Sequence, residues 1–154
     1  MAYRRELTEC PPFTWDEERR YAEILKGESY TKCFISPIYY YIIHFGARRP
    51  SITSAVEVID TDAEVFIRGE LVIEAGDEEK VAEEFRKIIT RGSGDELERP
   101  CTVTMIHKHE VDSKEVSHVH FICSTESFIY MSENVEKILK GIKRIADKYG
   151  IKEW

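Results

Sequence analysis

The sequence contains no hydrophobic run long enough to cross a membrane as a helix. Such a helix needs about 20 consecutive apolar residues, and charged residues interrupt every stretch of that length here. Residues 1–6 also lack the apolar core of a secretion signal. We therefore expect a cytoplasmic protein that has no membrane partner.

Cysteine pairs at metal-site spacing are absent as well. The chain has four cysteines, Cys10, Cys33, Cys101 and Cys123, and no two of them are separated by only two residues. This spacing excludes a zinc ribbon and a thioredoxin-type motif. In a reducing cytoplasm we expect four thiols, buried or free.

Amide side chains are scarce too. Glutamine is missing and Asn134 is the single asparagine, whereas glutamate and lysine are abundant, a usage that resembles that of thermophile proteins. The net charge of −7 repels phosphate backbones, so nucleic acid is not an expected partner. With 154 residues, of which 42% are hydrophobic and 33% charged, the chain predicts a single folded domain, residues 1–154.

The first 50 residues carry an N-terminal helix and an aromatic segment. Thr14 and Glu17 have the spacing of a capping box, which predicts a helix that ends near Gly27. Residues 30–45 are rich in aromatic and β-branched side chains and favour a strand, although Pro37 indicates a break or an edge position. A helical interpretation of the second half of this segment stays open.

Residues 54–150 repeat one pattern twice: two strands followed by a helix. The pattern places strands at residues 55–59 and 64–74, a helix at 77–91, a hairpin at 102–123 and a helix at 132–149. A fifth strand at 128–131 stays open. We therefore predict an α+β fold, a four- to five-stranded antiparallel sheet built from two ββα units with the helices on one face, plus the N-terminal helix. The order resembles a circular permutation of the ferredoxin-like arrangement, which carries little functional weight.

Four of the five histidines lie in the second hairpin. With its tip at Ser113 and Lys114, the pairing sets His107 opposite His120 and His109 opposite His118. Side chains two residues apart share a sheet face, and opposed Cβ atoms lie about 4.5–5.5 Å apart. The sequence thus predicts a compact square of four imidazoles, with Cys123 on the opposite face.

Such a square suits a transition metal such as zinc. Neutral imidazoles are common ligands for these ions, and a tetrahedral zinc site takes four ligands, or three with an open position for water. Our first hypothesis is a small intracellular metal-binding protein that uses His107, His109, His118 and His120 and is catalytic if one position is open. Two alternatives stay open: a pH-sensitive or proton-transferring histidine patch, and histidines packed at a subunit interface.

The second hypothesis is a non-catalytic interaction or regulatory module that oligomerises through its sheet face. A one-faced sheet needs a cover, and small α+β domains often pair. The tyrosine-rich segment, residues 39–41, is a candidate contact with a protein partner or a second copy. Separately, Arg48 and Arg49 beside Gly46 form a candidate anion-binding loop. No nucleophile stands at a recognisable spacing, so no reaction is predicted.

Overall fold

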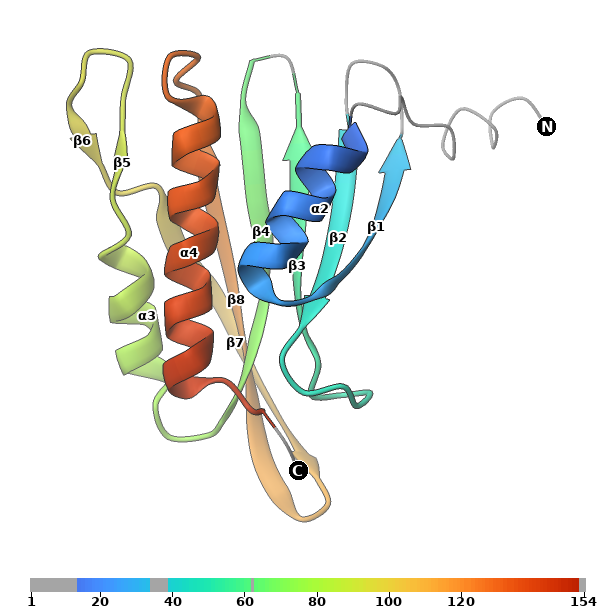
Figure 1. Ribbon diagram of the computed structural model, residues 1–154. Helices are drawn as coiled ribbons and strands as arrows, with labels where there is room; N and C mark the ends of the chain where they lie inside the picture. Colours follow the sequence, from blue (N-terminus) through green and yellow to red (C-terminus); the bar gives the residue numbers. More distant parts are fainter. Residues whose placement is uncertain (1–13, 34–38, 62, 153–154) are drawn as a thin grey trace.

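A six-stranded antiparallel sheet carries the helices of the described residues on one face, and no described helix lies on the other, which we call the open face (Figure 1). The computed structural model describes residues 14–33, 39–61 and 63–152. The sheet strands are β1 (Glu28–Cys33), β2 (Tyr39–Phe45), β3 (Ser54–Asp60), β4 (Val65–Glu74), β7 (Cys101–Val111) and β8 (Lys114–Thr125). The helices of the described residues are α2 (Thr14–Leu25), α3 (Glu78–Arg86) and α4 (Met131–Tyr149), and a separate small pair of strands is β5 (Thr90–Arg91) and β6 (Leu97–Glu98). None of these helices is long and apolar enough to span a membrane.

The predicted ββα repeat is confirmed. The units β3–β4–α3 and β7–β8–α4 meet through their second strands, because the sheet order is β1-β2-β3-β4-β8-β7. The aromatic segment forms strand β2, not a helix, and its pairing with β1 and β3 extends the sheet to six strands. The optional strand at 128–131 is instead a turn that leads into α4. Pro37 lies outside the described residues.

Alternation along the strands sends one set of side chains to the helices. On β2, Tyr41, Ile43 and Phe45 are almost fully buried in the main core. The phenol of Tyr41 donates to Glu17 Oε2 on α2 at 3.1 Å, so this tyrosine packs under the helix layer and is not the surface contact that the sequence suggested. The Phe85 ring of α3 stacks on the Phe121 ring of β8 with centroids 4.5 Å apart.

The helix boundaries differ in two places from the sequence prediction. Helix α3 ends at Arg86 and not near residue 91, because Ile88 turns into the core and the chain then enters β5. Helix α4 begins at Met131 with Tyr130 at its N-cap, two residues before Ser132, the N-cap that the sequence suggested.

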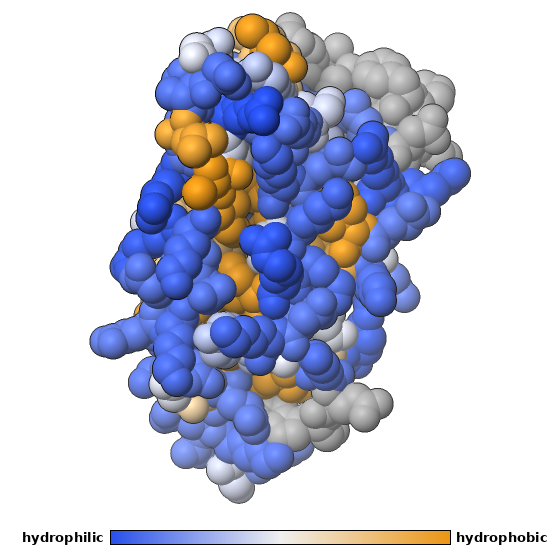
Figure 2. All heavy atoms as spheres, turned by 60° about the vertical axis from the view of Figure 1, so that its left-hand side comes forward, coloured by the Kyte–Doolittle hydropathy of each residue, from blue (hydrophilic) through white to orange (hydrophobic). Residues whose placement is uncertain are grey.

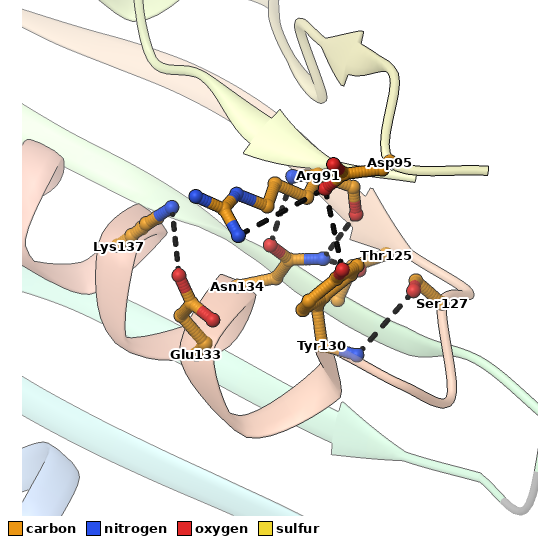
Figure 3. A network of polar contacts seen from close by, with 8 residues as sticks. All are labelled: Arg91, Asp95, Thr125, Ser127, Tyr130, Glu133, Asn134 and Lys137. Atoms are coloured by element: carbon orange, nitrogen blue, oxygen red, sulfur yellow. Dashed lines mark hydrogen bonds and ion pairs between the residues drawn. The ribbon is translucent and has the colours of Figure 1, made fainter. Parts of the chain in front are cut away.

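The first turn of α4 is fastened to β5 by a fully buried asparagine (Figure 3). The amide of Asn134 donates to the Arg91 carbonyl at 2.7 Å and to Thr125 Oγ1 at 3.0 Å, and its oxygen accepts from the Arg91 backbone N–H at 3.0 Å. Tyr130 lies under the Arg91 guanidinium and donates to Asp95 Oδ1. Because every polar group of the asparagine side chain has a partner, this network is a structural joint.

A disulfide joins β7 to β8, which corrects the expectation of thiols. Cys101 and Cys123 are directly opposed in the register, with Cα atoms 4.1 Å apart. The predicted register would have set Thr104 opposite Cys123. The register of the hairpin differs from the predicted one by two residues, which would bring Thr102 there, and a β-bulge between Val103 and Met105 moves the pairing one residue further, to Cys101. The side chains of Cys10 and Cys33 lie outside the described residues.

Candidate functional site

The four hairpin histidines lie on the open face of the sheet, opposite the helices. On β8, Val119 and Phe121 are buried in the main core, so the alternating side chains of His118 and His120 point to the other face. The β7 histidines, His107 and His109, reach the same face.

The pairing of these histidines differs from the predicted one. The hairpin turns at Asp112 and Ser113, whose φ angles of 53° and 67° are those of a two-residue type I′ turn. This turn sets Val111 opposite Lys114, one position closer to the N-terminus than the tip that the sequence suggested.

As a consequence, the four histidines do not form the predicted square, because those on β7 are offset along the sheet from those on β8. His107 is opposite His118, His109 is opposite Val116, and His120 is opposite Met105. The register differs from the predicted one by two residues. Because side chains two residues apart share a sheet face, every histidine stays on its predicted face. The structure therefore brings three of the four histidines together and sets His120 to one side.

The three grouped imidazoles form a triangle. His109 Nε2 and His118 Nε2 are 2.7 Å apart, and their ring centroids are separated by 4.6 Å. The His107 ring lies 5.9 Å from the His109 ring and 6.2 Å from the His118 ring. We refer to His107, His109 and His118 as the histidine triangle.

A carboxylate from the neighbouring strand orients the triangle. Glu70 of β4 pairs with His120 in the sheet. Its Oε1 lies 3.2 Å from His118 Nδ1, and its Oε2 lies 3.6 Å from His120 Nε2. The His118 side chain, held between Glu70 and His109, is only 11% exposed.

The three side chains form a row of close polar contacts. Glu70 Oε1 faces Nδ1 of His118, and Nε2 of His118 shares a hydrogen bond with Nε2 of His109, in which the donor depends on the tautomers of the two rings. The row leads from a carboxylate of β4 through two imidazoles to the edge strand β7.

One end of the site rests against a second, smaller core. Val72 and Val116 point to the open face and are buried there by Ala47 and Ile52 of the β2–β3 loop and by Ile151 after α4. This cluster gives the triangle an apolar, water-poor side.

The two loop arginines proposed as an anion site both face carboxylates. Arg49 Nη2 lies 2.5 Å from Asp112 Oδ2 at the tip of the β7–β8 hairpin, and Arg48 Nη1 lies 3.3 Å from Glu28 Oε2 of β1. These ion pairs tie the β2–β3 loop to the hairpin and to the sheet edge.

A hollow of about 580 Å³ lies on the other side of His120. It is lined by Ile42 and Ile122 and by the ion pair of Glu57 with Arg68, whose atoms are 2.9 Å apart. The fifth histidine, His44, also lines this hollow. In the sheet, Ala55 of β3 and Glu70 of β4 lie between His44 and the triangle.

Sequence reasoning identified the histidines but missed Glu70. The alternation of β4 places Glu70 on the polar face, but only the sheet order reveals that β4 lies beside β8. With the side chains as they stand, no group of three or more His, Cys, Asp or Glu residues among those described is arranged to hold a metal ion.

Fold and site together define a small α+β protein with helices on one sheet face and a carboxylate-supported histidine triangle on the other. Comparisons with protein families, with curated proteins and with solved structures found no match.

Proposed function

We propose that the protein binds a transition metal ion, zinc in the first instance, at the histidine triangle. The observation that carries the proposal is the close approach of His109 Nε2 and His118 Nε2, 2.7 Å apart, beside a carboxylate that holds the other nitrogen of His118. A metal-ligating histidine characteristically donates its second ring N–H to a carboxylate, which fixes its tautomer and raises its basicity.

The ring positions support this proposal. Two imidazoles bound to one tetrahedral zinc have ligand nitrogens about 3.3 Å apart and ring centroids about 5 Å apart, given zinc–nitrogen bonds of about 2.0–2.1 Å. The observed centroid separations of 4.6, 5.9 and 6.2 Å lie on both sides of that value. The proposal requires side-chain rotations that bring the three ligand nitrogens to about 3.3 Å from one another and replace the proton between His109 and His118 with the metal ion.

Each residue then has a role. His109 and His118 are the principal ligands, and His107 is the third. Glu70 orients His118 through one oxygen and contacts His120 through the other, so His120 lies between the metal site and the hollow. A fourth ligand completes the tetrahedron, and a water molecule in that position supports hydrolytic chemistry.

A zinc titration of the untagged, metal-stripped protein tests the proposal. Calorimetry on the wild type is expected to show saturable zinc uptake, and His118→Ala and His109→Ala are expected to abolish it. Glu70→Gln is expected to weaken binding about 10- to 100-fold, the usual effect of losing such a carboxylate. His44→Ala is the matched control, since His44 shares the open face but lies outside the triangle. Undiminished uptake by His118→Ala contradicts the proposal.

A second candidate function is a protein-interaction module that uses the open sheet face. Ile42, Phe66 and Ile122 are only half-buried on this face, which no helix of the described chain covers. The same titration separates the two functions, because an interaction module without chemistry of its own takes up no zinc.

A further inference from the structure

We propose that two copies of the chain pair antiparallel through the outer edges of strand β7, about a two-fold axis at His109. This pairing does not depend on the proposed metal binding and stands on the separate observations below.

Strand β7 ends the sheet, and no strand of the described residues pairs with its outer edge. In a hairpin with a two-residue turn, the residues that flank the turn, here Val111 and Lys114, form a hydrogen-bonded pair. From there, hydrogen-bonded pairs alternate with non-hydrogen-bonded pairs along the two strands. The backbone N–H and C=O groups of Lys108 and Glu110 therefore point away from β8. An unpaired row of this kind is a template for another strand.

The charges on this edge select one register. With the two-fold axis at His109, Lys108 of each copy lies opposite Glu110 of the other. These are the two residues whose backbone groups point away from β8 and can form the new hydrogen bonds. An axis at Lys108 sets two lysines against each other, and an axis at His107 sets Lys108 against Ile106. A lysine on an edge strand normally opposes self-pairing, but here the strand carries its own complementary glutamate two residues away.

The negative charge of Glu110 is also not balanced by a cation of the described residues. Within its own hairpin it lies directly opposite Glu115, a like-charge pair that destabilises a sheet. No ion pair of Glu110 is found in the part of the chain that the structure describes. Lys108 is half exposed, and its Nζ lies 3.6 Å from Glu78 Oε1, a loose contact that leaves it able to reach a second chain. Lys108 of the second copy supplies the cation beside Glu110.

The pairing has a direct consequence for the metal site. Lys108 and Glu110 form the hydrogen-bonded pairs, so the two His109 residues between them face each other as a non-hydrogen-bonded pair, the closer kind. Each His109 keeps its neighbour His118 within its own chain, 2.7 Å away between Nε2 atoms. His118 lies one strand further from the axis and opposite His107, two residues along from His109, so it is too far from the axis to share a ligand set with the second copy. The two histidine triangles therefore lie side by side on one continuous face, and we expect one zinc per chain.

Sedimentation velocity on the full chain, in chelator and then with added zinc, tests the pairing. The wild type is expected to dimerise. Lys108→Glu and Glu110→Lys each turn two attractive contacts into two repulsive ones, and each is expected to weaken the dimer about 10- to 100-fold. The double variant K108E/E110K restores both ion pairs and is expected to restore the dimer.

Glu110→Lys separates loss of pairing from loss of folding. The lysine that this substitution introduces faces Glu115 within the hairpin, so the variant is expected to be as thermally stable as the wild-type monomer or more so, while its dimer dissociates. A wild type that stays monomeric with and without zinc overturns the proposal, and so does a dimer that both single variants retain. If the dimer follows the charges and the protein takes up no zinc, the strand pairing stands and the metal function fails. If a monomer takes up zinc, the metal function stands and the pairing fails.

Discussion

At the residue scale, Glu78, at the start of α3, is a buried carboxylate with several partners. Its carboxylate accepts from Ser117 Oγ at 2.7 Å and from the Gly76 backbone N–H at 2.9 Å, with Lys108 nearby. Burial alone would raise the pKa of this carboxyl, but the hydrogen bonds and the lysine outweigh it and lower the pKa below its ordinary value of 4.5. The carboxylate therefore fastens α3 to the β7–β8 hairpin.

The lowered pKa of Glu78 predicts how the contribution of this residue to stability depends on pH. A carboxyl whose folded pKa lies below its unfolded value stabilises the protein fully above the unfolded pKa and loses this contribution as the pH falls through the folded pKa. Glu78→Gln is expected to cost about 1–2 kcal/mol at pH 7, and the difference from the wild type is expected to shrink below pH 4.5. Urea unfolding between pH 3 and pH 7 measures it, with the exposed neighbour Glu79→Gln as the control. A pH-independent difference contradicts the assignment.

At the element scale, the joint between α4 and β5 depends on one side chain. Asn134→Asp keeps the shape of the side chain but removes both donated hydrogen bonds, those to the Arg91 carbonyl and to Thr125. The buried carboxylate oxygen then faces a carbonyl, so we expect a loss of about 2–3 kcal/mol at neutral pH in urea unfolding. Ser132→Ala, an exposed change on the same helix turn, is expected to be nearly neutral. Equal stabilities for the two variants would show that the network does not hold the helix.

Also at the element scale, the sequence predicts which segments form strands and helices better than it predicts how the strands pair. Alternation along β4 and β8 and the helical stripe of α4 identify these elements because each has one buried face. The hairpin register did not follow, because Asp112 and Ser113 lack the Asn-Gly or Asp-Gly signature of a type I′ turn. The bulge beside Thr104 has no glycine to mark it, so the partner of Cys101 was missed as well.

At the scale of the whole molecule, the sheet separates stability from candidate function. One face holds the main core under three helices of the described chain, and the other holds the histidine triangle, its carboxylate and the hollow. Figure 2, which brings the left-hand side of Figure 1 forward, shows a mostly hydrophilic surface with hydrophobic areas set among charged side chains. Glu70 reaches the triangle only because β4 and β8 are neighbours in the sheet. This contact joins residues 48 positions apart, and no local sequence pattern encodes it.

The Cys101–Cys123 disulfide acts on the stability of the whole domain, because it links the edge strand β7 to the neighbouring strand β8 across a sequence separation of 22. Closing a loop of this size limits the unfolded chain and contributes about 3 kcal/mol. We therefore expect a reductant to lower the melting temperature by about 6–12 °C. The double variant C101A/C123A should melt near the reduced wild type and should not respond to the reductant. Because the bond lies on the helix side of the sheet, zinc uptake at the opposite face should persist at temperatures where the reduced protein is still folded. An unchanged melting temperature, with alkylation confirming that both thiols are free, contradicts a stabilising role for the bond.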